Sequence, residues 1–107
     1  MAWKVEIKPS VIDDLGWFGR KEGRLILQTA LKHLAVDPEL ESRNLKTLRP
    51  NPIAQRELRL MGKYRVLFNV DRPEELVTIV LAGEKRGEAL LVQGKEFVAH
   101  HESDSPE

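Results

Sequence analysis

Arginines alternate with apolar residues across residues 55–81, and no other stretch of the sequence is better suited to chemistry. The apolar positions are all even-numbered: Leu58, Leu60, Tyr64, Val66, Phe68 and Val70. Arg59, Lys63 and Arg65 fall between them at the period of a β-strand. Paired residues of a hairpin share a face, so an odd-numbered loop, most simply Leu60-Met61-Gly62, places Arg59 beside Arg65.

Two adjacent arginines repel each other unless an anion lies between them. The pattern therefore predicts an outward surface, carrying Arg59 and Arg65, that binds a phosphate-bearing partner. The alternative is that both arginines are ordinary solvated residues on the outer face of a half-buried sheet.

The charge of the chain is segregated, although 17 basic and 17 acidic side chains balance to a net charge of zero. Residues 43–65 carry seven basic side chains and one acidic one, a net charge of +6. The flanking residues 1–42 and 66–107 have net charges of −1 and −5. Screening limits a surface field to about 10 Å at a salt concentration near 0.1 M. The central segment is therefore predicted to form a cationic patch on a neutral protein.

Several classes of protein are disfavoured by composition. The 107 residues suffice for one core, and the absence of cysteine excludes disulfides and thiolate metal sites. No apolar run is long enough to span a membrane, and the sequence contains neither a glycine-rich phosphate loop nor metal-ligand spacing. We expect a cytoplasmic protein that does not associate with membranes, with no cofactor and no metal.

The order of elements predicts an α+β domain. Residues 3–8 alternate as a strand, a helix starts at Ser10, and a second helix follows Gly23 with an apolar stripe ending at Ala35. Residues 39–52 are predicted to be a loop carrying Lys46 and Arg49.

Four strands are expected after this loop, in a largely antiparallel segment packed on the helical hairpin. Two form the arginine hairpin, residues 76–82 form an apolar central strand, and residues 88–93 form the last strand. Residues 83–87 are predicted to interrupt the sheet, and Gly94-Lys95 is a predicted turn. One domain should span residues 1–98, followed by a disordered polar tail at residues 99–107.

This ordered set of motifs resembles the RelE/ParE superfamily of toxins from type II toxin–antitoxin modules. The resemblance spans about residues 3–92 and rests on four motifs: Leu58-Arg59, Gly62 with Tyr64-Arg65-Val66-Leu67-Phe68, the apolar strand, and Gly83 with Lys85-Arg86. It implies a toxin that either cleaves mRNA on the ribosome, as RelE-like members do, or inhibits DNA gyrase, as ParE-like members do. The implied partners are a cognate antitoxin, the ribosome and mRNA, with promoter DNA contacted only through the antitoxin.

The RelE-like alternative implies an endoribonuclease that inhibits translation. Its catalytic cations would be Arg65, Lys85 and Arg86, which stabilise the charge that develops on the attacked phosphate. The predicted RNA-binding residues are basic side chains of the central segment: Arg59, Lys63, Arg56, Lys46 and Arg49.

The cations favour the endoribonuclease, but two departures from the RelE-like pattern weaken the catalytic interpretation and leave open, as the alternative, a member that only binds its target. RelE-like toxins often carry lysines before the hairpin turn, where this sequence has Gln55 and Glu57 around Arg56. They commonly have a tyrosine or histidine on the last strand for proton transfer, and residues 88–92 contain neither. Tyr64 is predicted to be a core residue, and His33 a surface residue.

Overall fold

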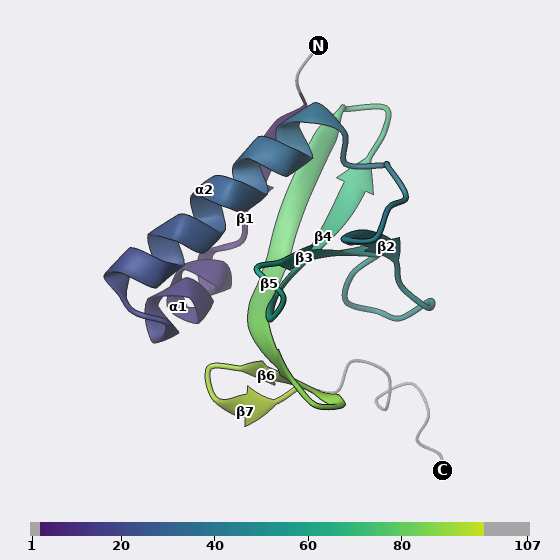
Figure 1. Ribbon diagram of the computed structural model, residues 1–107. Helices are drawn as coiled ribbons and strands as arrows, with labels where there is room; N and C mark the ends of the chain where they lie inside the picture. Colours follow the sequence, from purple (N-terminus) through teal and green to yellow (C-terminus); the bar gives the residue numbers. More distant parts are fainter. Residues whose placement is uncertain (1–2, 98–107) are drawn as a thin grey trace.

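A sheet with two helices against one face makes up the fold (Figure 1). The structure is a computed structural model that describes residues 3–97. Along the chain lie β1 (Lys4–Ile7), α1 (Pro9–Trp17), α2 (Arg20–Val36), β2 (Leu45–Thr47), β3 (Arg56–Leu60), β4 (Tyr64–Asp71), β5 (Leu76–Arg86), β6 (Ala89–Val92) and β7 (Lys95–Glu96). The predicted α+β class is confirmed. The proposed tail at residues 99–107 lies outside the described residues, and the single domain spanning residues 1–98 stays a prediction.

The main core lies between the helices and the sheet. Val11 and Leu15 of α1 and Ile26, Ala30 and Leu34 of α2 pack against buried residues of the strands, including Leu58, Val66, Phe68, Val77 and Ile79. All the even-numbered positions predicted to face inward are buried, except Val70, which is partly buried. Burial of these apolar surfaces is the principal force that holds the helices on the sheet.

Helix α2 begins at Arg20, three residues before the predicted boundary at Gly23. Gly23 lies inside the helix because the two helices come together there. A Cβ atom at this position would lie 2.5 Å from the backbone oxygen of Leu15. The prediction placed Gly23 before the helix, whereas it lies inside the helix and permits close packing of α1 on α2.

Strand β5 is the centre of the sheet, as predicted. Antiparallel β4 pairs along one edge, while the other edge is shared by parallel β1 at Leu76–Ile79 and antiparallel β6 at Glu84–Arg86. A β-bulge interrupts the β4–β5 register: Phe68 pairs with Ile79 and Leu67 pairs with Leu81. Val80 is therefore an extra residue in β5. Before the bulge the odd-numbered residues of β5 face the helices, and after it the even-numbered residues do.

The sheet differs from the prediction in β2, in the end of β5 and in the turn between β6 and β7. The predicted loop at residues 39–52 contains β2, a short edge strand antiparallel to β3. Strand β5 continues through Arg86 instead of ending at residue 82, because β6 folds back and supplies hydrogen-bonding partners. The predicted turn at Gly94-Lys95 lies one residue earlier, since Lys95 pairs with Val92 in the β6–β7 hairpin.

The hairpin loop between β3 and β4 has three residues, Met61-Gly62-Lys63, because Leu60 pairs with Tyr64. The predicted odd length is confirmed, but the loop lies one residue later than predicted. Gly62 has a φ of 75°, the left-handed conformation expected of it.

Candidate functional site

A row of basic side chains lies on the face of the sheet opposite the helices. The register pairs Arg59 of β3 with Arg65 of β4, and Arg65 with Gly83 of β5. Lys85, two residues beyond Gly83, shares this face by strand alternation. Lys46 of β2 lies opposite Glu57 and also shares it. We call Lys46, Arg59, Arg65 and Lys85, together with Glu57, the basic face.

An apolar cluster covers part of this side of the sheet. Ala54, Leu67 and Leu81 are buried there, and Leu48, Ile53, Leu90, Val92 and Phe97 are among the residues that pack against them. The outer face is therefore not simply solvated, and Arg65 is only 9% exposed. Arg65 lies on the outer face, as predicted, but it is largely buried there because loop 48–55 and the β6–β7 hairpin add a second layer.

The anion between the two arginines is a side chain of the protein itself. Glu57 lies 3.6 Å from Nε of Arg59 and 3.3 Å from Nε of Arg65. Burial lowers the pKa of the Arg65 guanidinium from its ordinary value, Glu57 opposes this shift, and Arg59 adds to it. An arginine stays protonated under these influences, so the three side chains together carry one net positive charge.

Lys85 and Arg86 point to opposite faces, so the structure does not gather both around Arg65. Alternation places Arg86 on the helix side, where its Nε lies 3.7 Å from Glu84. Lys85 has no ion-pair partner among residues 3–97, and its backbone N–H donates to the carbonyl of Lys63 at 2.7 Å. Of these two predicted catalytic cations, Lys85 alone lies on the basic face.

Lys63 and Arg49 are both exposed, and neither belongs to the basic face as defined above. The Nζ atom of Lys63 lies 5.1 Å from the ring centre of Tyr64, whose side chain is in the main core. Arg49 lies in the loop after β2, where its carbonyl accepts a hydrogen bond from the Asn51 side chain. Both contribute to the general positive potential of the segment.

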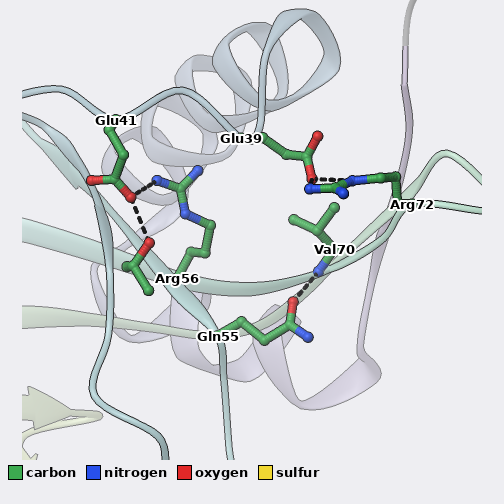
Figure 2. Close-up of a pocket in the computed structure, with 7 residues that line it drawn as sticks. Glu39, Glu41, Gln55, Arg56, Val70 and Arg72 are labelled. Atoms are coloured by element: carbon green, nitrogen blue, oxygen red, sulfur yellow. Dashed lines mark hydrogen bonds and ion pairs between the residues drawn. The ribbon is translucent and has the colours of Figure 1, made fainter.

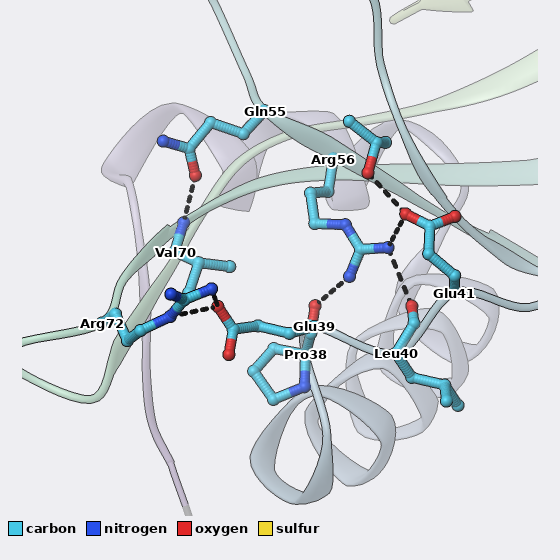
Figure 3. Close-up of polar contacts among 9 residues, drawn as sticks. Pro38, Glu39, Leu40, Glu41, Gln55, Arg56, Val70 and Arg72 are labelled. Atoms are coloured by element: carbon cyan, nitrogen blue, oxygen red, sulfur yellow. Dashed lines mark hydrogen bonds and ion pairs between the residues drawn. The ribbon is translucent and has the colours of Figure 1, made fainter.

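Arg56, a predicted RNA contact, is a buried structural residue. Its guanidinium donates to the carbonyls of Pro38 and Leu40 and to the carboxylate of Glu41, the last at 2.7 Å (Figure 3). The residue is 6% exposed. Alternation puts it on the helix side of β3, where it fastens the α2–β2 connection to the sheet, so it is not part of a cationic surface.

A polar pocket of about 360 Å³ adjoins Arg56 (Figure 2). Its charged groups are paired with one another: Arg72 donates to Glu39 at 2.8 Å, and Glu41 accepts from Arg56 and from the Thr47 hydroxyl. The hydrogen bond from Thr47 lowers the pKa of Glu41, with a further lowering by the nearby Arg56 and a partial opposing effect of desolvation. A charged ligand would have to displace these pairs.

The tyrosine and histidine of the described residues lie away from the basic face. The Tyr64 hydroxyl is on the helix side and donates to Glu22 at 2.7 Å. Burial, the hydrogen bond to Glu22 and the charges of Glu22 and Glu84 raise the pKa of Tyr64 to about 12. The predictions that Tyr64 is a core residue and that His33 is exposed are confirmed.

Asp14 is a buried carboxylate that was not predicted from the sequence. Its two oxygens accept from the Ala82 backbone N–H at 3.1 Å and from the Gln93 side chain at 2.7 Å. Strand β1 pairs with residues 76–79 of β5, and β6 pairs with residues 84–86 along the same edge. Asp14 accepts a hydrogen bond from the backbone N–H of Ala82, which lies between these two paired segments. Its place on the stripe of Val11, Leu15 and Phe18 is the sequence signal that could have revealed it.

Within residues 3–97, no three histidine, cysteine, aspartate or glutamate side chains gather as a metal site would require. Neither helix in this part of the chain is long and apolar enough to cross a membrane.

Solved toxin structures share this architecture. The toxin–antitoxin complex RelBE2 from Mycobacterium tuberculosis contains a chain that superimposes with a TM-score of 0.67 at 21% identity, covering 79% of this chain and 93% of that one. A mutant of the E. coli toxin RelE in the free state gives a TM-score of 0.56 at 23% identity, covering 78% of this chain and 83% of that one. No family model and no curated protein matches the sequence. At these identities the likeness establishes the fold, and the chain therefore has the fold of the RelE-like toxins.

Proposed function

We propose that this chain is the toxin component of a type II toxin–antitoxin module and acts in the cytoplasm as a ribosome-dependent mRNA endoribonuclease. The observation that carries the proposal is the pairing of Arg59 with Arg65 on one face of a RelE-like fold, with Lys46 and Lys85 beside them. A positively charged face of this kind suits the phosphate backbone of RNA.

The proposed reaction is attack of a ribose 2′-oxygen on the adjacent phosphorus, with departure of the 5′-oxygen. Negative charge builds on the non-bridging oxygens in the transition state, and Arg59, Arg65 and Lys85 would stabilise it. A well-placed donor of this kind contributes about 3 kcal/mol. Arg86 has no part in this arrangement because it points to the other face.

Proton transfer is assigned to the ribosome in this proposal. Among residues 3–97, no tyrosine or histidine lies on the basic face, which carries Glu57 as its sole carboxylate. General acid–base catalysis contributes about 100- to 10,000-fold. Cleavage of naked RNA should accordingly be very slow, and cleavage within translating ribosomes much faster.

The proposed partner is a cognate antitoxin, which would silence the toxin and connect it to promoter DNA. One of the similar solved structures is a toxin–antitoxin complex. Expression of the chain alone should arrest growth, and co-expression of the protein encoded beside it should restore growth. Normal growth at verified soluble expression would contradict the toxin role.

Primer extension on mRNA from arrested cells tests the nuclease activity. New 5′ ends within coding regions are expected, and they should be absent with the Arg59→Gln variant. Arg59 suits this purpose because its side chain is 42% exposed and fills no core.

A binding-only toxin of the ParE-like kind is the second candidate. The missing tyrosine or histidine on the basic face favours it, because a protein that only binds DNA gyrase needs no proton-transfer groups. Intact mRNA together with gyrase-linked DNA breaks in arrested cells would support this candidate and exclude the nuclease.

A further inference from the structure

Glu57 is enclosed by the cations that would have to receive a phosphate. Glu57 and Arg59 are two residues apart on β3, and Arg65 lies directly opposite Arg59 on β4. The side chain of Glu57 is 14% exposed, compared with 42% for Arg59 and 10% for Arg65. An anion that reaches Arg65 therefore meets the Glu57 carboxylate, which lies 3.3 Å from its Nε.

The Glu57 carboxylate neutralises the charge of the two arginines, but it does not accept a hydrogen bond from the Nε–H of Arg65. Its distances of 3.6 and 3.3 Å to the two arginines are ion-pair distances, and the Nε–H of Arg65 is buried with no hydrogen-bond acceptor among residues 3–97. Arg56 also has a buried Nε–H without an acceptor among these residues, but its terminal nitrogens donate to two carbonyls and a carboxylate. Arg56 and Arg72 donate directly to carboxylates at 2.7 and 2.8 Å (Figures 2 and 3).

An anion is nevertheless required at this position. Like charges directly opposite on neighbouring strands destabilise a sheet, and a buried arginine without a counter-charge is strongly unfavourable. Glu57 supplies the negative charge, but the buried Nε–H of Arg65 still has no hydrogen-bond acceptor. A phosphate has more acceptor oxygens and accepts hydrogen bonds from two guanidinium groups at once.

We propose that Glu57 is a built-in competitor of the phosphate group: its carboxylate occupies the anion position between Arg59 and Arg65 and is displaced when RNA binds. The inference rests on the proposed function only in naming RNA as the polyanion. Glu57 keeps the buried arginine neutralised in the free protein and reduces the affinity of the basic face for phosphates in general. An RNA held in place by a larger assembly would overcome this competition, whereas free nucleic acid would do so poorly.

The test is direct binding of a single-stranded DNA oligonucleotide, measured by fluorescence anisotropy at low salt. The probe lacks the 2′-hydroxyl, so it reports binding and cannot be cleaved by the proposed reaction. Glu57→Gln keeps the shape of the side chain and removes its charge. We expect it to bind the probe roughly tenfold more tightly than wild type, since a like charge a few ångströms from the bound phosphate has been removed.

Glu84→Gln is the matched control. It changes the net charge equally and also removes a carboxylate paired with an arginine, Arg86, but on the opposite face. Its affinity for the probe should stay close to that of wild type. Equal tightening in both variants would show a general charge effect and overturn the proposal.

Unchanged or weaker binding by a folded Glu57→Gln variant would also overturn it, since Glu57 would then serve only to position the arginines. If this variant does not fold, carbon-13 NMR of the wild-type carboxylates decides. Displacement predicts that the Glu57 side-chain carboxyl resonance moves on addition of the probe, and a stationary resonance at saturation contradicts the proposal. These binding measurements stand independently of toxicity and mRNA cleavage, so a failure of the proposed function is distinguishable from a failure of this inference.

Discussion

Tyr64 and Arg65 are consecutive residues of β4 whose side chains lie on opposite faces of the sheet, and each has a perturbed pKa. For Tyr64, the folded-state pKa of about 12 is above that of an exposed tyrosine, about 10. The folded state therefore holds this proton more strongly. The resulting stabilisation is complete below the unfolded pKa and is lost as the pH rises through the folded pKa.

Tyr64→Phe should remove this alkaline dependence. Wild type should lose about 2 kcal/mol of unfolding free energy as the Tyr64 hydroxyl ionises, beyond the loss that the variant shows. Urea denaturation on both sides of pH 10 measures the difference between the two proteins. Parallel stability curves would mean that the hydroxyl titrates as it does in the unfolded chain.

Phe68→Ala and Arg65→Ala separate core packing from the basic face. Phe68 has no exposed surface, and its truncation should cost about 3–5 kcal/mol. Arg65→Ala should cost less, about 1–3 kcal/mol, because Arg59 still neutralises Glu57 after the ion pair is lost. Chemical denaturation of the two variants gives both values. An Arg65→Ala variant as unstable as Phe68→Ala would make Arg65 mainly structural.

At the residue scale, the sequence predicted what depends on periodicity alone. Alternation identified Leu58, Val66 and Phe68 as inward-facing and placed Arg59 beside Arg65. It did not reveal that Glu57 neutralises both arginines, since this depends on side-chain distances across two strands. Nor did it reveal Asp14, whose buried carboxylate is needed only because β1 and β6 leave a gap along the edge of β5.

At the scale of elements, the two glycines that lie inside α1 and α2 should respond in opposite directions to alanine. Gly16 of α1 has open space around its Cα, so Gly16→Ala should stabilise the protein by about 0.5–1 kcal/mol through helix propensity. Gly23→Ala gains the same propensity but meets the Leu15 carbonyl at 2.5 Å. Forced separation of the helices should make it destabilising by about 1–3 kcal/mol. Thermal melts that shift in the same direction would contradict this packing.

The β-bulge at Val80 determines which basic residue of β5 joins Arg65. With the register of Phe68 and Ile79 continued, Arg65 would lie opposite Ala82, and Arg86 would share its face. The extra residue places Arg65 opposite Gly83 instead, and Lys85 joins the basic face. The apolar run of residues 76–82 gives no sign of a bulge, so the sequence could not discriminate between Lys85 and Arg86.

Alanine substitution of these two neighbours tests this assignment. Lys85→Ala should weaken oligonucleotide binding several-fold, because a cation that faces the phosphates is lost. Arg86→Ala should leave binding almost unchanged and act as the control for net charge. Anisotropy titrations of both variants at one salt concentration are sufficient. A larger loss for Arg86→Ala would mean that the bound strand runs along the other face.

At the scale of the whole molecule, only some of the basic side chains that are clustered in the sequence lie together on one face of the protein. Of the seven basic side chains in residues 43–65, Arg56 is buried beneath the α2–β2 connection and Lys63 lies over an aromatic ring of the main core. Lys85, from outside the segment, joins through the sheet. The sequence predicted where positive charge lies along the chain. Which of these side chains lie on the basic face depends on strand register and on the loops that cover the sheet.

The salt dependence of oligonucleotide binding should show how many cations of the protein contact phosphates. For single-stranded nucleic acid, the logarithm of the association constant falls with the logarithm of salt concentration with a slope of about −0.7 for each neutralised phosphate. The basic face has four cations, Lys46, Arg59, Arg65 and Lys85, and Glu57 opposes them. The slope for wild type should therefore lie between about −2 and −3. If all seven basic side chains of residues 43–65 took part, the slope would approach about −5. Anisotropy titrations over a series of potassium chloride concentrations distinguish these values, and the steeper slope would show that the whole cationic segment, instead of one face of the sheet, receives the nucleic acid.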